Sequence, residues 1–242
     1  IFASSSSASL LIDKKAHLTG RSRLLEIEPL DFQEFLIFKN YSSKKSEKYL
    51  LENHFKKYME LGGMPEYVLT EDPNYISSLV DNIIYKDIIA INTIKNITVV
   101  KDLFRLLCER VGKQVSYNKL SKVLGISKDT VKKYIGFFVD SYLFFIVEKD
   151  SKSLNERLAD NKKIYCADVG IKNVTTGFRD LGAIYENLVF LKIKTKNPGY
   201  VKRDGVELDF KFNNTLIEAK YNSELNDKQK KLFNSLKVKN KL

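Results

Sequence analysis

The sequence predicts a mixed α/β fold, and three features of the chain carry this prediction. Amphipathic helical stretches fill the first half, three short helical segments at helix-turn-helix spacing lie within residues 98–149, and two alternating runs joined by Asn213-Asn214 lie near the C-terminal end. Hydrophobic residues make up 43% and aromatic residues 12% of the 242 residues. A chain of this composition has enough apolar material for one or two hydrophobic cores.

Composition also excludes several classes of protein. No apolar run approaches the length of a membrane span, and Ile1–Leu11 has neither the basic start nor the long apolar centre of a signal peptide. Cys108 and Cys166 stand far apart in apolar surroundings, as reduced core residues do, and His17 and His54 are too few for a zinc cluster. We therefore expect a cytoplasmic protein without a membrane partner. Because the chain starts at Ile rather than Met, we also expect a fragment.

The formal net charge of +11 is unevenly distributed along the chain. Residues 1–95 carry a net charge of −1, residues 96–160 carry +4 and residues 161–242 carry +8. A basic C-terminal two thirds favours a polyanionic partner such as nucleic acid. The alternative is that the chain comes from a Lys-rich and Asn-rich proteome, in which a basic surface needs no partner.

The first elements follow from strand alternation and capping signals. Ser4–Ser7 form a loop, Leu24–Glu28 is predicted as a strand, and Phe32–Phe38 as a helix. Asp31 and Glu34 have the spacing of a capping box at the start of this helix.

Two longer helices are predicted next. Tyr49–Leu61 ends at Gly62-Gly63, and Pro65 prevents its continuation. Tyr75–Ile91 places its apolar residues on one helical stripe, which predicts a single amphipathic helix.

The middle of the chain has the spacing of a winged helix. Val99–Val111 and Tyr117–Leu124 are predicted helices, and a third runs from Ser127, its cap, to about Phe138. The apolar run Ser141–Val147 and the strand Lys163–Ala167 are predicted to form the wing.

The third helix of this unit is the candidate DNA-binding element. Its apolar side chains share one face, and the opposite face carries Lys128, Thr130, Lys132 and Lys133. Basic and hydroxyl side chains at the start of a recognition helix are suited to phosphate and base-edge contacts. Two alternatives stay open: a solvated lysine face, and a unit that packs against another protein module.

The alternating runs Val206–Phe212 and Thr215–Tyr221 predict a hairpin, because Asn tolerates the positive φ of a two-residue turn. With Asn213-Asn214 as the loop, Asp209 lies opposite Glu218, and Glu207 lies opposite Lys220. Two carboxylates facing each other are destabilising unless a cation lies between them. Magnesium suits such a pair because it takes one or two carboxylates and also binds phosphate oxygens. Lys220 would then orient a water or stabilise the phosphoryl charge.

Asp209 followed by Glu218-Ala219-Lys220 resembles the PD-(D/E)XK motif of restriction-endonuclease-like nucleases. A helix acid completes that family's site, and Glu186 on the predicted helix Gly182–Lys194 stands in the corresponding place. The resemblance implies that Glu186, Asp209, Glu218 and Lys220 are catalytic and that Asp209 and Glu218 bind magnesium. The alternative is the wet face of an ordinary hairpin, with Lys220 paired to Glu207.

Motifs along nearly the whole chain resemble a prokaryotic AAA-type ATPase family that carries a C-terminal winged helix and a PD-(D/E)XK nuclease-like domain of unknown function. In chain order, these motifs are the serine loop, Leu18-Thr19-Gly20-Arg21, Pro29–Leu36, Leu61-Gly62-Gly63-Met64-Pro65-Glu66, Ile83–Ile88 and Lys163–Gly170. The resemblance places Arg21 near the nucleotide, and Asp168, before Gly170, is interpreted as a turn residue.

The ATP phosphate loop of this class is not found. It ends in Gly-Lys-Ser/Thr, whereas Gly112-Lys113 is followed by Gln114. We therefore expect ATP to bind only together with a Walker A/B half that this chain lacks.

The sequence thus predicts four parts. Residues 1–40 are the C-terminal edge of an AAA-type ATPase core, 41–97 a helical linker or lid region, 98–160 a winged helix, and 161–242 a nuclease-like domain that we expect to lack its later strands. The leading hypothesis is a DNA-associated ATPase fragment whose last domain cleaves DNA with magnesium. The alternative is a non-catalytic adaptor that binds DNA, a protein partner or a second copy of itself, with all chemistry in the ATP-binding half.

Overall fold

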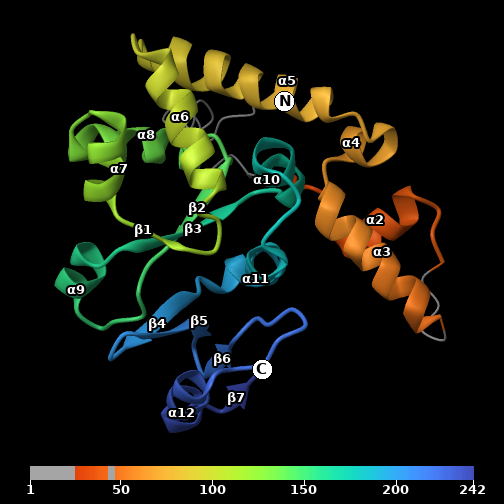
Figure 1. Ribbon diagram of the computed structural model, residues 1–242, viewed down its shortest axis with the longest axis vertical. Coiled ribbons are helices and arrows are strands. Elements are labelled where there is room, and N and C mark those ends of the chain that lie inside the picture. The colour runs from red at the N-terminus through yellow and green to blue at the C-terminus, as the bar shows by residue number, and fades with distance from the viewer. Residues whose placement is uncertain (1–24, 43–46) are drawn as a thin grey trace.

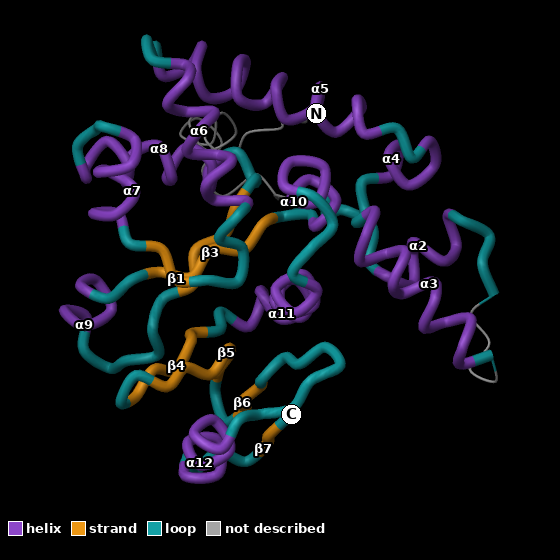
Figure 2. Tube along the Cα trace, in the orientation of Figure 1, coloured by secondary structure: helices purple, strands orange, loops and turns teal. Residues whose placement is uncertain are grey.

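The computed structural model describes residues 25–42 and 47–242, and these form a mixed α/β structure (Figure 1). Helices fill the upper part of the view, and two small sheets lie in its centre and lower part (Figure 2). Among the described residues, none of the helices has both the length and the apolar character needed to cross a bilayer.

The first half of the described chain is helical. Its elements are α2 (Phe32–Phe38), α3 (Lys48–Leu61), α4 (Pro65–Thr70), α5 (Pro73–Asn82) and the π-helix η1 (Ile83–Ala90). The capping box predicted for α2 is present: the Asp31 carboxylate accepts from the Glu34 backbone N–H, and Glu34 accepts from the Asp31 N–H. Gly62 ends α3 with a φ of 73°, and Pro65 opens α4.

Two predictions in this half differ from the structure. The described part of the predicted strand Leu24–Glu28 has no regular secondary structure, and Ile27 is 97% exposed. Alternation forms a strand only beside a partner strand, and none pairs with these residues in the part of the chain that the structure describes. The predicted helix Tyr75–Ile91 changes from α to π at Ile83, while Ile76, Ile84 and Ile88 stay buried on one side.

The middle of the chain combines helices with a three-stranded antiparallel sheet. The elements are α6 (Ile97–Cys108), β1 (Gln114–Val115), α7 (Tyr117–Leu124), α8 (Lys128–Asp140), β2 (Phe144–Val147), α9 (Leu154–Ala159) and β3 (Lys162–Cys166). The strand order is β1-β3-β2. Ser116 and Ser127 cap α7 and α8 as predicted, whereas α6 ends three residues before the predicted Val111, which instead bridges to Ile164.

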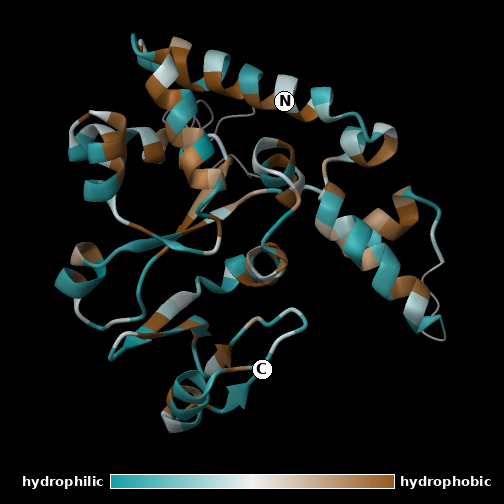
Figure 3. Ribbon diagram, in the orientation of Figure 1, coloured by the Kyte–Doolittle hydropathy of each residue, from teal (hydrophilic) through white to brown (hydrophobic). Residues whose placement is uncertain are grey.

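The last part consists of a helix, a four-stranded sheet and a second helix. Its elements are α10 (Val169–Thr176), α11 (Leu181–Ile193), the 3₁₀ turn η2 (Lys194–Lys196), β4 (Gly199–Arg203), β5 (Val206–Phe212), β6 (Thr215–Ile217), α12 (Asp227–Ser235) and β7 (Asn240–Lys241). The strand order is β4-β5-β6-β7, with β7 parallel to β6. One strand after α12 is therefore present, although the sequence predicted none. Figure 3 shows α12 as largely hydrophilic, and none of its residues is buried.

The two sheets are hydrogen-bonded to each other. The residues after β2 run parallel to β4, where the Tyr200 N–H donates to the Glu148 carbonyl (3.0 Å) and the Asp150 N–H donates to the Tyr200 carbonyl (2.7 Å). The predicted boundary between residues 160 and 161 separates β3 from β1 and β2, the strands with which it pairs. The last two predicted parts are consequently joined through both β3 and β4.

Asp168 connects the helical half to the end of β3. It caps α10 by accepting from the backbone N–H groups of Gly170 and Ile171, and it also accepts from the Gly63 N–H at 2.6 Å. A Cβ added to Gly170 would lie 2.1 Å from the Leu61 carbonyl oxygen. Two glycine backbones and one buried carboxylate thus let α10 dock directly on the turn between α3 and α4. Cys108 and Cys166 are buried and free, as predicted.

Candidate functional site

The hairpin turn and its register follow the sequence prediction. Asn213 has a φ of 48°, and Phe212 pairs with Thr215 and Phe210 with Ile217. Leu208 and Phe210 of β5 are buried in two different hydrophobic clusters, while Asp209 is buried and Glu207 half-buried. The β4–β5 register shifts between the pairs Gly199–Lys211 and Val201–Leu208, so strict alternation does not hold at Asp209.

Asp209 and Glu218 lie next to each other just beyond the last paired residues. The Asp209 backbone N–H donates to Glu218 Oε2 (2.9 Å), and the Ala219 N–H donates to Asp209 Oδ2 (3.0 Å). Each carboxylate therefore accepts a backbone hydrogen bond from the other strand. The predicted proximity of these two side chains is confirmed.

The predicted pairing of Glu207 with Lys220 is wrong. The β5–β6 ladder ends at Ile217, and Lys220 donates to Glu218 Oε1 at 2.8 Å. Glu207 instead lies opposite Lys202 of β4 and accepts from Gln114 of β1. The register cannot be extrapolated to residue 220 because the chain leaves the strand after Ile217.

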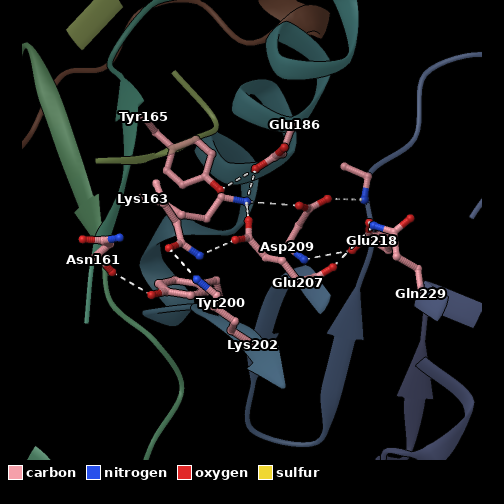
Figure 4. Close-up of polar contacts among 12 residues, drawn as sticks. Asn161, Lys163, Tyr165, Glu186, Tyr200, Lys202, Glu207, Asp209, Glu218 and Gln229 are labelled. Atoms are coloured by element: carbon pink, nitrogen blue, oxygen red, sulfur yellow. Dashed lines mark hydrogen bonds and ion pairs between the residues drawn. The ribbon is translucent and has the colours of Figure 1, made fainter. Parts of the chain in front are cut away.

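Lys163 lies at the centre of the acidic side chains (Figure 4). Its Nζ is 2.7 Å from Glu186 Oε1, 2.9 Å from Glu207 Oε1 and 3.1 Å from Asp209 Oδ1, and its side chain is 1% exposed. We call Lys163, Glu186, Glu207, Asp209, Glu218 and Lys220 the acid–lysine cluster.

From the sequence, Lys163 was predicted only to be the first residue of a strand and its motif, and no functional role was predicted for it. One signal could have found it: alternation puts Lys163 on the same face of β3 as Tyr165, which is fully buried. A lysine on a buried strand face needs carboxylate partners.

Glu186 joins the cluster from α11, as predicted. Its Oε1 accepts from the Tyr165 hydroxyl at 2.6 Å and pairs with Lys163. Burial, opposed by Lys163 and reinforced by the charge of Asp209, raises the pKa of Glu186 to about 7. A carboxyl with this pKa is partly protonated at neutral pH.

Burial acts on the other members of the cluster as well. It raises the pKa of Glu218, with the charge of Asp209 adding to the effect and Lys220 opposing it. Burial alone would lower the pKa of Lys163, but Tyr165 and the surrounding carboxylates together raise it well above the ordinary lysine value. Lys163 is therefore an ammonium at neutral pH.

The cluster holds four carboxyl groups and two lysines, so carboxylates outnumber ammonium groups. Every oxygen of Asp209 and Glu218 accepts a hydrogen bond, because Lys163 and Ala219 serve Asp209, while Lys220, Gln229 and the Asp209 N–H serve Glu218. In residues 25–42 and 47–242, no three Asp, Glu, His or Cys side chains are placed to hold a metal ion as they stand. In the acid–lysine cluster, the lysines and hydrogen-bond donors thus offset part of the negative charge of the carboxyl groups, and part of it remains.

The predicted DNA-binding residues lie on α8, away from this cluster in Figure 1. Lys128, Lys132 and Lys133 are exposed, and Thr130 is half-buried with its hydroxyl hydrogen-bonded to that of Ser127. Val131, Ile135 and Phe138 on the opposite face are fully buried. Arg21, the predicted nucleotide contact, lies outside the described residues.

The chain is similar to one described family and to two curated proteins. Residues 52–181 match the family model described as "Domain of unknown function (DUF8612)". An uncharacterized protein of Methanocaldococcus jannaschii is 34% identical over 95% of this chain and 56% of its own length, and one of Haemophilus influenzae is 29% identical over 87% of this chain and 55% of its own length. The chain therefore spans about half the length of these curated relatives.

No solved structure matches the chain. The matched region includes β3 and Lys163 but ends before Glu186 and the hairpin. Because the family model covers more than half of the 242 residues, this chain belongs to the DUF8612 family.

Proposed function

We propose that the chain is the C-terminal part of a DNA-associated AAA-type ATPase, in which a winged helix binds DNA and a PD-(D/E)XK-like domain cleaves it with magnesium. One observation carries the proposal. Glu186 from α11, Asp209 from β5, and Glu218 and Lys220 from the segment after β6 belong to one network of direct contacts. The four residues that the motif requires are separated by up to 34 positions in sequence, and they meet only through the fold.

The donor groups of the cluster are of the type that a magnesium ion takes. Asp209 and Glu218 would hold it, since hard divalent cations prefer carboxylate oxygens, and the surplus of carboxylates leaves negative charge for a cation to neutralise. When bound, magnesium would supply Lewis-acid stabilisation of the phosphoryl oxygens.

The chain's own residues have separate roles in this proposal. Lys220 is 29% exposed beside Glu218 and can contact a phosphate charge from solvent. Glu186, with its pKa raised to about 7, can hold or release a proton at a carboxyl oxygen near neutral pH.

The α7–α8 unit supports the DNA-binding half of the proposal. Both helices carry Ser caps, α8 buries one face, and the paired strands β2 and β3 follow it in the chain as the strands of a wing would. Lys128, Thr130, Lys132 and Lys133 are the proposed contacts, and the first phosphate contacts would come from the three exposed lysines.

A second candidate function is a non-catalytic adaptor that binds DNA or a protein. The observation that favours it is the position of the Lys163 ammonium, which already pairs with three of the carboxylates. In this alternative, ATP hydrolysis in the longer protein is the only chemistry, and the present chain binds no nucleotide.

Cleavage of a DNA duplex in a magnesium and manganese titration tests the two candidates. The nuclease proposal predicts metal-dependent cleavage that Asp209→Asn and Glu218→Gln reduce by at least about 100-fold, because each removes a carboxylate from the reacting site. Asp204→Asn, the same chemical change in the exposed β4–β5 turn, is the control and should keep full activity.

Cleavage that survives Asp209→Asn contradicts the nuclease proposal. Salt-sensitive DNA binding without cleavage at any metal concentration would establish the adaptor instead.

A further inference from the structure

The ammonium of Lys163 occupies the place in the cluster where a cation is required. An ammonium has three protons to donate, and Lys163 has three carboxylate partners, on Glu186, Glu207 and Asp209. Lys163 Nζ donates a hydrogen bond to Asp209 and is ion-paired with Glu186 and Glu207, so its charge is directed into the cluster.

Neighbouring side chains fix this arrangement from several elements. The Tyr165 hydroxyl donates to Glu186, and the Gln114 amide donates to Glu207 while accepting from Lys202. Lys163, Tyr165 and Gln114 all come from the three-stranded sheet, whereas the carboxylates come from α11 and β5. The cluster is consequently assembled from two sheets and completed by a lysine outside the predicted nuclease motif.

We propose that Lys163 is the resident cation of the acid–lysine cluster, and that it sets the affinity of the cluster for a divalent metal ion. Lys163 acts through Asp209, so it is a positioning residue of the proposed metal site. The inference rests on the proposed function for the identity of that site, and its test does not use DNA cleavage.

The electrostatic argument has two parts. A positive charge within hydrogen-bond distance of Asp209 repels a divalent cation bound to the same carboxylate and competes for its Oδ1. Without the ammonium, the carboxyl groups of Glu186, Glu207 and Asp209 would be left without this counter-charge, and a divalent cation would relieve their mutual repulsion. Removing the charge should therefore tighten metal binding.

Isothermal titration calorimetry with manganese chloride on the whole chain, without nucleic acid, is the test. Lys163→Met keeps the apolar stem but removes the charge, and it should bind manganese at least about tenfold more tightly than the wild type. The Lys163→Met/Asp209→Asn double variant should lose this gain.

Lys211→Met is the matched control. Lys211 lies on the same strand as Asp209 but pairs with Asp150 outside the cluster, and the variant has the same net charge as Lys163→Met. Its manganese affinity should equal that of the wild type. Affinity in Lys163→Met that is unchanged or weaker, or an equal gain in Lys211→Met, overturns the inference.

If Lys163→Met does not fold, a second measurement still tests the inference. Circular dichroism should then show that manganese restores the fold, because the metal replaces the missing cation, and failure to restore it contradicts the inference. The two proposals fail separately: wild-type cleavage with no gain in affinity for Lys163→Met removes only this inference, whereas a gain without any cleavage removes only the nuclease proposal.

Discussion

At the scale of single residues, acidic side chains fall into two groups. Water can donate hydrogen bonds to the exposed ones, whereas the protein itself must supply the hydrogen bonds of the buried ones. Asp168 belongs to the second group, because three backbone N–H groups donate to it and burial nevertheless raises its pKa to about 6. From the sequence, Asp168 was interpreted as a turn residue before Gly170, and this agrees with its position between β3 and α10. It could not show the bond to Gly63, since that partner lies 105 positions earlier.

The raised pKa of Asp168 predicts a pH dependence of stability. Between about pH 4 and pH 6 the unfolded chain loses this proton before the folded chain does, so a rise in pH lowers the free energy of unfolding, by up to about 3 kcal/mol. Asp168→Asn should remove this slope. Urea unfolding of both proteins at several pH values measures it, and parallel curves for wild type and variant would contradict the prediction.

Gly170 predicts a steric effect at the same corner. Gly170→Ala should destabilise the chain by about 2 kcal/mol or more, because the new Cβ meets the Leu61 carbonyl. Gly136→Ala is the control, since a Cβ there meets nothing within 4 Å and Ala favours the helix α8. Thermal unfolding should show a lower midpoint for Gly170→Ala and an equal or higher one for Gly136→Ala.

At the scale of elements, local signals predicted those elements that have caps, turn residues or clear periodicity. The helices α2, α7 and α8 have such signals, and their predicted limits agree closely with the structure. The turn and register of the β5–β6 hairpin also agree, but β6 ends at Ile217, four residues before the predicted Tyr221. The strands β1 and β7 were missed because two residues have no periodicity. The helix α10 was missed because it buries polar side chains, Lys172 and Asn173, that satisfy backbone carbonyls of other segments.

The exposed face of α8 predicts a specific salt dependence. If Lys132 and Lys133 each contact a phosphate, changing either to Ala should weaken DNA binding and lower the slope of log affinity against log salt concentration by about 1. Lys56→Ala on α3 removes an exposed lysine elsewhere and should leave the slope unchanged. Fluorescence anisotropy across a salt series measures both, and equal slopes for all variants would argue against DNA contact by α8.

At the scale of the whole molecule, charge counted along the sequence and charge arranged in space give different information. Residues 161–242 carry +8, yet the same region holds the four carboxyl groups of the acid–lysine cluster. The pairing of Asp209 with Glu218 could be predicted, because it depends on a two-residue turn. Alternation could indicate that Lys163 is buried, but its partners Glu186, Glu207 and Asp209 could not be predicted, because they depend on how β3 packs against α11 and β5.

The strand β3 carries a chemical group at each end. Lys163 stands near its beginning, and Asp168 lies two residues beyond its end and holds the turn between α3 and α4. The two residues are five positions apart, which is at most about 17 Å of extended chain. This strand therefore connects the turn between α3 and α4 to the carboxylates of the acid–lysine cluster. Any tilt of those helices that pulls on Gly63 must also pull the ammonium against its three acidic neighbours.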